Sequence, residues 1–531
     1  MPLFGFEGDN AREKVIVLLT MCFALAMAML DNTVVNVALP TISRELEAGV
    51  SELQWIVDGY VLVFASLLLT GGIVGDRYGR KKTFLAGLVV FTIASLACGL
   101  SQDTTQLILA RALQGLGAAF LLPGTLSIIT VTFPPHERAR AIGLWAGMSA
   151  LALALGPTVG GLMVERLGWE SVFFLNVPIG IIAFLVATRT VRESVSEQQR
   201  SLDLPGLALG SSALFLVTYA LIEANEMGWT DPLIVSSLVG FVVLLAAFLL
   251  WEMRNPNAMM PLTLFRIPAF SAGNAVAFSV SLGMFATFFF LSLYMQTIRG
   301  YTAFEAGVRF LPMTLLIIAT APLAGQYAQK HGSRIPMTYG LLLASGGLFT
   351  LSRLSVDTPY LLMLPVFAIM GHGMGATMAP MTAAVMNAVG HERAGLGSGM
   401  TNTSREVGGV FGIALLGTVL TTRLRGALEP ALAQIGLPPE QQAVVAAAAG
   451  RGRIDPELLR TLSPEQRAAV AEAFRQSFMS GFRVSLFLGG LVLLAGAFVA
   501  NRFIPGRAAA REMQAARGRE VSGEATPAME F

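Results

Sequence analysis

The chain has 531 residues, of which 54% are apolar and 13% charged, and its mean hydropathy is +0.65. This composition excludes a string of water-soluble domains and indicates a polytopic membrane protein, with no reason to expect a nucleic-acid partner. The net charge of +2 says little, because orientation depends on where Lys and Arg lie in short loops. The only two cysteines, Cys22 and Cys98, lie in apolar runs, so we expect no disulfide, metal site or cofactor.

A membrane span needs about 20 mostly apolar residues. We expect the first span to be a retained helix, because its apolar run is longer than the core of a signal peptide. The segment 426–477 is polar with some helical character and is not expected to span. The sequence predicts an all-α fold with fourteen spans, at 15–38, 52–74, 83–101, 106–131, 139–163, 171–190, 204–224, 232–251, 269–297, 304–327, 335–353, 359–388, 395–422 and 478–504.

The loops predict an orientation. Short loops on one side, such as 101–105 and 225–231, carry acids and no Lys or Arg. The loops on the other side are basic, and Lys and Arg accumulate in cytoplasmic loops. Both termini are therefore expected in the cytoplasm and the 426–477 segment outside. The basic loops lie at 75–82, 136–140, 189–200, 330–334 and 391–393.

An internal repeat divides the chain. The sequence His-Glu-Arg-Ala at 136–139 recurs at 391–394, and Gly-x-x-x-Asp-Arg-x-Gly at 72–79 recurs in degraded form at 325–332. Repeats of this kind are typical of transporters built from two similar halves. The predicted parts are an N-terminal six-helix bundle (1–200), an inserted helix pair (201–255), a C-terminal six-helix bundle (256–505) and a cytoplasmic tail (506–531).

A short basic loop follows the span at 52–74. Its glycines allow a tight reversal, and we expect Asp76 to cap the next helix, where a carboxylate is favoured. The cations alone would suit any topology-setting loop, but the spacing of the motif is more specific. The residues of this motif are Gly72, Asp76, Arg77, Gly79 and Arg80.

Charged side chains inside predicted spans indicate a structural or functional role, because a charge at the centre of a span raises the free energy of membrane insertion by about 2.5–3.5 kcal/mol. Asp31 and Arg111 both fall in the outer half of the membrane and form either a fixed ion pair or a titrating site, in which protonation of Asp31 frees Arg111. Asp58 lies at similar depth, only about six residues inside its span. It is either a further proton site or a residue facing interfacial water.

A further acid, Glu406, lies about 18 Å along the span 395–422. Arg405 is a poor partner because adjacent helical residues do not face each other, whereas Asn402, one turn back, is expected to donate a hydrogen bond. Glu406 would carry a second proton, attract a cationic drug, or remain permanently protonated. The spans also supply side chains for a central cavity, predicted to include Met27, Gln114, His372, Asn402 and Arg405. For His372, a proton relay and a packed, hydrogen-bonded side chain are both open.

The span 139–163 contains Gly156, Pro157, Gly160 and Gly161. Small residues let a neighbouring helix approach closely, which is sufficient reason for their presence. The Gly-Pro-x-x-Gly-Gly spacing, however, also resembles the antiporter motif of exporters in the major facilitator superfamily.

The resemblance extends further. The loop 72–82 is similar to the superfamily's signature loop, and this resemblance implies that its motif residues act as a conformational switch. The segment 107–117 resembles the superfamily's proton-coupling motif. The segments 30–40 and 169–180 resemble those of fourteen-helix drug:proton antiporters of the EmrB/QacA type. The chain departs from that family at Arg405-Glu406, where the family often has Arg-Gln, and by lacking an acid deep in the span 304–327.

The resemblance implies proton-coupled export of amphipathic drugs or other small organic compounds across the cytoplasmic (inner) membrane of a bacterium. The partners would be substrate, protons and lipid; no motif supports a periplasmic adaptor. An exporter of one endogenous metabolite, such as a siderophore or an antibiotic, would share every motif, and a uniporter without proton coupling stays open. A membrane enzyme would need a catalytic cluster at the interface. The histidines at 136 and 391 read instead as part of the repeat.

Overall fold

The computed structural model describes residues 11–195, 202–389, 394–438, 441–442, 445 and 462–506. Every regular element in these residues is a helix. The loop 391–393, the tail from 507 onward and the segment 446–461 lie outside the described residues. The first three residues of the second His-Glu-Arg-Ala sequence belong to that loop and lie outside them too.

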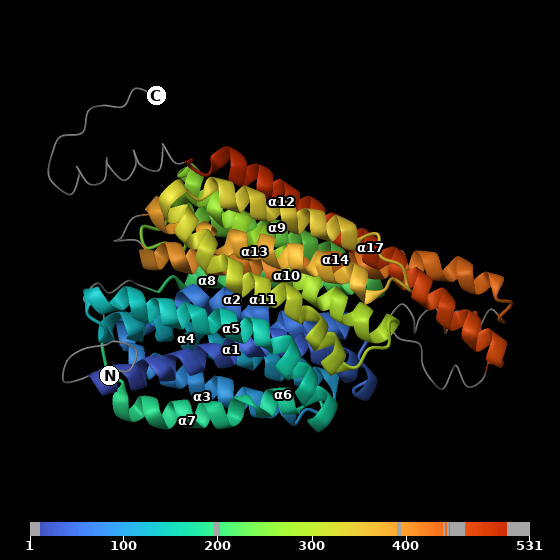
Figure 1. The fold of residues 1–531 in the computed structure, drawn as a ribbon, viewed down its shortest axis with the longest axis horizontal. Helices are drawn as coiled ribbons and strands as arrows, with labels where there is room; N and C mark the ends of the chain where they lie inside the picture. Colours follow the sequence, from blue (N-terminus) through green and yellow to red (C-terminus); the bar gives the residue numbers. More distant parts are fainter. Residues whose placement is uncertain are drawn as a thin grey trace.

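The N-terminal half is a bundle in which the predicted spans appear close to their expected bounds (Figure 1). The last predicted span, 171–190, is broken at Leu175, so that a single turn precedes the long helix. The helices are α1 (Ala11–Glu45), α2 (Val50–Tyr78), α3 (Arg80–Gly99), α4 (Thr104–Thr132), α5 (Pro135–Leu167), α6 (Ser171–Phe174) and α7 (Asn176–Thr190).

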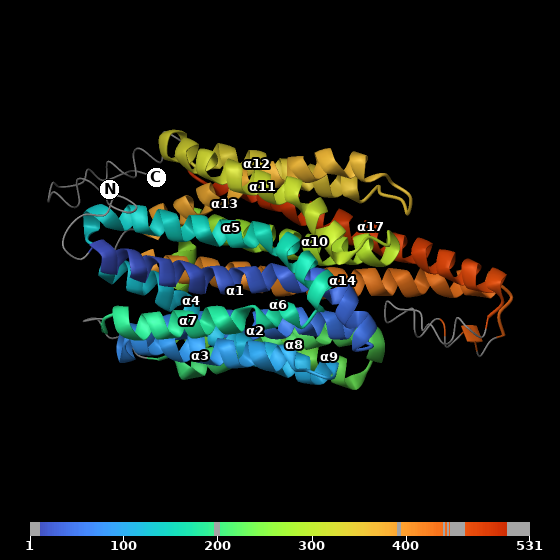
Figure 2. The same ribbon diagram turned by 60° about the horizontal axis from the view of Figure 1, so that its bottom comes forward.

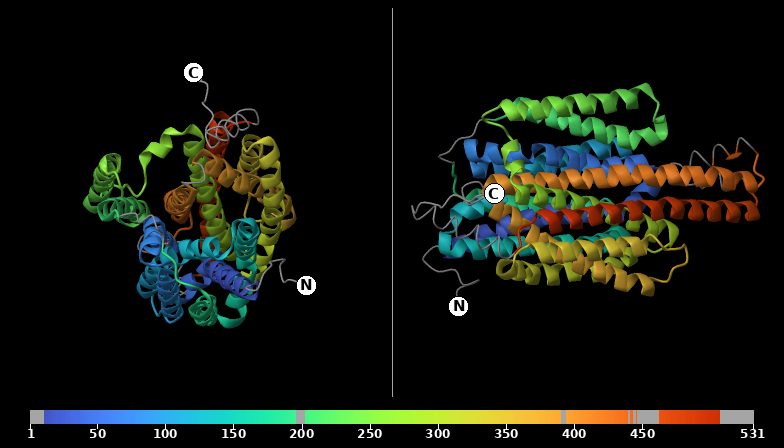
Figure 3. Two further views of the ribbon diagram at one scale, coloured as in Figure 1. Left: turned by 90° about the vertical axis from the view of Figure 1, so that its left-hand side faces the viewer. Right: turned by 90° about the horizontal axis from the view of Figure 1, so that it is seen from above.

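The inserted pair consists of α8 (Leu204–Met227) and α9 (Pro232–Arg254), and it lies beside the rest of the bundle (Figure 3). Both helices begin with the same local signal. An aspartate, Asp203 or Asp231, accepts a backbone N–H of the first turn, and a proline follows where no N–H is needed. A short 3₁₀ helix, η2 (Leu262–Arg266), then leads into the C-terminal half.

The C-terminal half repeats the bundle. Its first helix ends in a π-helical turn, η3 (Tyr294–Ile298). The halves meet where α5 packs against α11, α2 against α14, and α1 against α10. The long helices are α10 (Pro268–Leu293), α11 (Ala303–His331), α12 (Arg334–Leu351), α13 (Tyr360–Val389), α14 (Ala394–Gln434) and α17 (Pro464–Phe503).

Within the described residues, twelve helical segments are long and apolar enough to cross a membrane. The prediction of a helical, polytopic membrane protein is confirmed. The helices α5 and α12, 33 and 18 residues long, match two predicted spans but are not among the twelve. The count of fourteen spans therefore stays a prediction.

The last two helices are longer than predicted. The helix α14 has 41 residues, which corresponds to about 60 Å at about 1.5 Å per residue, roughly twice the thickness of the hydrocarbon core. With α17 it projects beyond the bundle as a hairpin (Figures 1 and 2). Although the segment 426–477 is polar in composition, its described ends and the helical residues next to them carry apolar residues at helical spacing. The buried ones are Leu424, Leu428, Leu432, Val470, Phe474 and Phe478.

Candidate functional site

The centre of the N-terminal half holds a buried ion pair. Arg111 of α4 donates to Asp31 of α1 over 2.5 Å, and each side chain is only 1% exposed. The structure thus brings together two residues that lie 80 positions apart in the sequence. Since an isolated charge is costly in such surroundings, each of these groups depends on the other.

Neutral side chains complete the pair. Gln114 accepts from Arg111 over 2.7 Å and donates to the second oxygen of Asp31 over 2.9 Å. Asn176 of α7 donates to that same oxygen over 2.8 Å, and Gln114 also donates to Ser95 of α3 over 2.9 Å. All of these side chains are buried. Both oxygens of Asp31 are therefore occupied, and four long helices converge on one carboxylate.

The remaining surface of Arg111 faces α2 and α6. Its Nε donates to the carbonyl of Ile56 over 3.1 Å. The guanidinium lies over Tyr60, 4.3 Å from the ring centroid, and 5.8 Å from the centroid of Phe173. Aromatic faces attract a desolvated guanidinium. Sequence reasoning missed Ser95, Tyr60 and the role of Asn176, because neutral polar residues in apolar runs carry no pattern that distinguishes a partner from a packed residue.

Asp58 does not face interfacial water, as one sequence interpretation proposed. It is completely buried in α2, and neither carboxylate oxygen has a hydrogen-bond partner among the described residues. A buried carboxylate without donors is unfavourable in its charged form. Asp58 is thus a second acid in the N-terminal half, but it does not join the Asp31 network.

Glu406 is the corresponding lone acid of the C-terminal half. It is 8% exposed on α14, and its Oε2 has no hydrogen-bond partner in the part of the chain that the structure describes. The expected bond from Asn402 is absent there, and Asn402 is exposed.

The basic loop differs from the prediction in one respect. Asp76 lies in the last turns of α2 and accepts from Arg80 over 2.8 Å, so it does not cap α3. That role belongs to Glu193, whose carboxylate accepts the backbone N–H groups of Lys81 and Lys82 over 3.0 and 3.2 Å. A carboxylate at a helix N-terminus is favoured whichever part of the chain supplies it.

Glycine is required at the junction between α2 and α3. Gly79 has φ of +117°, and a Cβ there would lie 2.7 Å from the carboxylate of Glu193. The strand-like segment after α7 holds the loop through a second contact, from the N–H of Arg80 to the carbonyl of Ser194 over 3.0 Å. Arg77 lies over the ring of Tyr78, 5.5 Å from its centroid. The loop is therefore fixed to its own half.

The Gly-Pro motif of α5 packs against two helices. Gly156 and Gly160 lie against Thr33 and Val34 of α1, too close for a Cβ. Gly161 lies equally close to the backbone of α11 at Ala303. Close packing thus accounts for these residues, and it places α5 between the pair-bearing helix α1 and the C-terminal half.

Hydrogen bonds between the halves lie toward one end of the helices. Each joins a neutral side chain to a backbone carbonyl, and each lies toward the end at which α1 ends and α2 begins. Among the described residues, these bonds are Gln54 to Ile413 (2.8 Å), Ser292 to Asn36 (2.6 Å), Gln296 to Val37 (3.0 Å) and Thr158 to Gly307 (3.2 Å).

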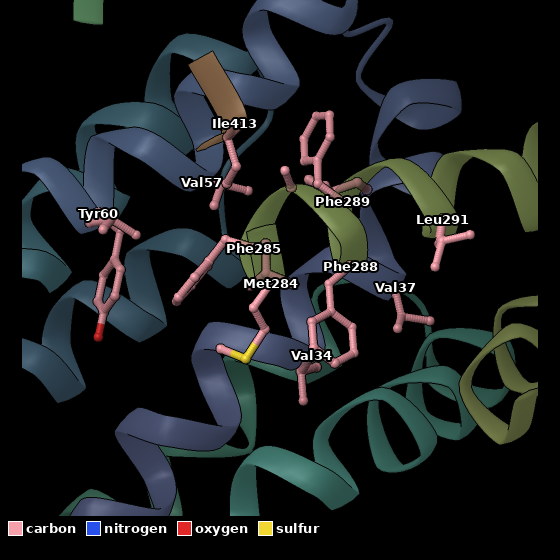
Figure 4. Close-up of a cluster of buried hydrophobic side chains, with 14 of the residues drawn as sticks. Val34, Val37, Val57, Tyr60, Met284, Phe285, Phe288, Phe289, Leu291 and Ile413 are labelled. Carbon is pink, nitrogen blue, oxygen red and sulfur yellow. The ribbon is translucent and has the colours of Figure 1, made fainter. Parts of the chain in front are cut away.

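An apolar cluster fills the space beside these bonds. Figure 4 shows side chains from α1, α2, α10 and α14 meeting there, with the aromatic rings contributed mainly by α10. A dry, close-packed contact of this kind excludes water. The halves are therefore sealed at this end. The labelled members are Val34, Val37, Val57, Tyr60, Met284, Phe285, Phe288, Phe289, Leu291 and Ile413.

The residues predicted to line a cavity differ in their exposure and in their hydrogen bonds, and their common role stays a prediction. Met27 is 2% exposed, and the amide of Gln114 is fully used by the network. His372 is packed and hydrogen-bonded: its Nδ1 lies 2.9 Å from the hydroxyl of Thr320, and the ring of Tyr339 meets it edge-on. Asn402 is exposed and Arg405 is half-buried. In the described part of the chain, no cluster of His, Cys, Asp or Glu could hold a metal ion.

The chain forms two helical halves, and the N-terminal half holds a buried acid–arginine pair. An architecture of two similar helical halves is typical of membrane transporters. The sequence profile of the Major Facilitator Superfamily matches residues 21–413, and the chain belongs to this superfamily. The chain is similar to the tetracenomycin C resistance and export protein of Streptomyces glaucescens, with 34% identity over 91% of this chain and 90% of that protein.

It is also similar to the multidrug resistance protein Stp of Mycobacterium tuberculosis, with 34% identity over 91% of this chain and 92% of the relative. Among solved structures, a bacterial homologue of the human lysosomal transporter Spinster, in an inward-facing and unoccupied conformation, matches with a TM-score of 0.61. The two sequences are 18% identical, and the structural match covers 93% of this chain and 98% of the homologue. At this identity the match supports the fold alone.

Proposed function

We propose that this protein exports amphipathic drugs or other small organic compounds across the cytoplasmic membrane of a bacterium in exchange for protons. The observation that carries the proposal is the buried Asp31–Arg111 pair inside a superfamily fold. The names of the relatives, a tetracenomycin C exporter and a multidrug resistance protein, support drugs or antibiotics as the substrate class.

Protonation of Asp31 is the proposed coupling step. A proton on this carboxyl group removes the negative charge that holds Arg111, so the guanidinium loses its ion pair. Arg111 keeps its bond to the carbonyl of Ile56 and its contact with Tyr60, both of which belong to α2. The released charge would therefore act on α2, which packs against α14 of the other half. Such a bias favours one of two packed arrangements.

We propose that the arrangement seen here is open to the cytoplasm. The four hydrogen bonds between the halves lie toward the end of the helices that the positive-inside rule assigns to the outside. At the opposite end, the partner of Asp76 within the described residues is Arg80 of its own half. In the reverse state the loop Gly72–Arg80 would contact the C-terminal half and hold the cytoplasmic end closed.

The proposed topology has fourteen spans, α5 and α12 included, with both termini in the cytoplasm. The start of α1 and the end of α17 lie at the same end of the molecule, which supports this arrangement (Figure 1). It can be tested with single cysteines on a variant lacking Cys22 and Cys98. Gln434→Cys should react with an impermeant reagent in intact cells, and Arg502→Cys only after permeabilisation. The reverse pattern would invert the topology.

The proposed function is tested in inside-out vesicles with and without a pH gradient. Wild type should concentrate several cationic and neutral dyes only when a gradient is present, whereas Asp31→Asn should bind dye without accumulating it. Asp103→Asn is the matched control, because Asp103 is an exposed N-cap of α4 and Asn caps equally well. Gradient-driven accumulation by Asp31→Asn would place coupling elsewhere.

A second candidate is a dedicated exporter of one metabolite. The name of the relative from Streptomyces glaucescens, which specifies a single compound, favours it. Growth-inhibition profiling across chemically unrelated compounds separates the two functions. Protection against a single compound class would support the dedicated exporter, and protection across classes the multidrug exporter.

A further inference from the structure

A second pair of acids lies where the inserted helices meet the linker to the C-terminal half. Asp203 precedes α8 and Glu252 lies in the last turn of α9, and the two side chains are 7% and 3% exposed. Gly206 leaves room for them, since a Cβ at this position would lie 2.5 Å from Asp203 Oδ2 and 2.8 Å from Glu252 Oε1. The carboxyl groups therefore border the same small space.

The two acids differ in their hydrogen bonds. Asp203 accepts from the N–H of Gly206 over 3.0 Å, the indole of Trp251 over 2.8 Å and the N–H of Met259 over 3.2 Å. Burial disfavours the charge of Asp203, but these three bonds outweigh that effect and lower its pKa. Asp203 is therefore the member of the pair that remains ionised.

Glu252 has less support. Its Oε2 accepts the N–H of Met260 over 2.9 Å, while its Oε1 has no hydrogen-bond partner among the described residues. Within the described residues, the charged group beside it is Asp203. Arg254 on the same helix and Arg266 on η2 are exposed, and neither forms an ion pair in the described part of the chain. Two adjacent buried carboxylates without a cation cannot both be charged at low cost.

We propose that Asp203 and Glu252 form a proton-binding site in which a single proton, carried by Glu252 Oε1, is donated to Asp203 Oδ2. This hydrogen bond would satisfy the oxygen that otherwise lacks a partner. Loss of the proton to water leaves two carboxylates that repel each other. The site is separate from Asp31 and belongs to the inserted helix pair.

Hydrogen bonds connect this site to the linker and to α2. The carboxylates hold two consecutive N–H groups of the linker, those of Met259 and Met260. The sulfur of Met259 in turn accepts from the hydroxyl of Thr70 on α2, 3.7 Å away and next to the start of the switch loop. Deprotonation would weaken the hold on this linker, so that its attachment to α2 depends on pH.

Tryptophan fluorescence of the intact protein tests the site, because Trp251 donates directly to Asp203. Emission would be recorded between about pH 5 and about pH 9, a range that brackets a buried, acid-paired carboxyl group. We expect one single-proton transition, lost in Trp251→Phe and in Glu252→Gln, which mimics the protonated state. Glu223→Gln is the matched control, since Glu223 accepts from Trp55 over 2.7 Å at the other end of α8. It should leave the transition unchanged.

Infrared difference spectroscopy provides a second reading on the wild type. A protonated-carboxyl stretching band should disappear with the same midpoint as the fluorescence change, and it should be missing in Glu252→Gln. A transition that survives in Glu252→Gln, or the absence of any transition in the wild type, would overturn the proposal. Neither measurement depends on transport, so the result is independent of the proposed function.

Discussion

Asp31 in the N-terminal half and Glu406 in the C-terminal half are both buried acids, but they differ in their hydrogen-bond partners. In the N-terminal half, both oxygens of Asp31 are occupied by donors from α4 and α7. In the C-terminal half, Glu406 has one oxygen without a partner and no ion pair in the described residues. A carboxylate with charged and neutral donors is stable when ionised, whereas one without them is stable when neutral. Among the described residues, the buried ion pair thus belongs to the N-terminal half alone, whereas each half holds an acid that lacks donors, Asp58 in one and Glu406 in the other.

The difference extends to the loops at the ends of the second helix of each half. The N-terminal loop carries Asp76, which pairs with Arg80, whereas the repeated position in the C-terminal half is the neutral Gln329. Tyr60 contacts the ion pair through the guanidinium of Arg111, which lies 4.3 Å from the centroid of its ring. We therefore expect substitutions in the ion pair and the loop of the N-terminal half to affect transport more than substitutions in the C-terminal half.

The largest effect is expected for Arg111→Ala. Removal of one partner of a buried ion pair leaves an uncompensated charge and costs about 3–5 kcal/mol. Transport should be lost and the midpoint of thermal unfolding lowered. Arg111→Lys is the control: it keeps the charge but loses the planar fork, so stability should recover further than transport. Equal thermal stability of Arg111→Ala and wild type would show that the pair contributes nothing to the fold.

A large effect on transport, with little on stability, is expected for Asp76→Asn. If the loop holds the cytoplasmic end closed in the reverse state, its loss shifts a two-state balance by about 1–3 kcal/mol, or about 5–150-fold. Initial efflux rates at matched expression measure this. Gln329→Ala, at the repeated position, should behave as wild type, and equal losses in both variants would remove the asymmetry between the loops.

Asn176→Ala should have an intermediate effect. It removes one donor to Asp31 and leaves Arg111 and Gln114 in place, so we expect a loss of about 1–3 kcal/mol of stability. The pH dependence of efflux should also move, because the carboxylate is less well solvated by its neighbours. Ser95→Ala, which removes no direct bond to Asp31, is the control. A pH profile identical to wild type would make Asn176 a packing residue.

The smallest effect is expected for Glu406→Gln. If this acid remains protonated, the amide replaces it with little change in shape or charge. If it carries a proton or attracts cations, transport of divalent cations should fall more than that of monovalent ones. The comparison would be made between about pH 6 and about pH 8. Unchanged transport of both classes would leave Glu406 without a coupling role.

Much of the architecture is determined by local sequence. Hydropathy and length located the helices, because every backbone group in a membrane must be satisfied within its own segment. The depth of Asp31 and Arg111 followed from residue counting, and their opposite charges suggested the pair. The close packing of the Gly-Pro motif on α5 was also predictable, because small residues allow a neighbouring helix to approach closely.

Only the tertiary structure decided which distant residues contact each other. The donor Asn176 lies 145 residues from Asp31, and the cap of α3 comes from Glu193, 112 residues beyond Lys81. Asp76 is nearer to α3 in the sequence, and the prediction that it caps this helix was wrong. A helix N-terminus is stabilised by any carboxylate that the fold brings within reach. The hairpin of α14 and α17 was hidden because each apolar seam is stable only against the other. Such pairings depend on the assembly of distant segments, which no local pattern records.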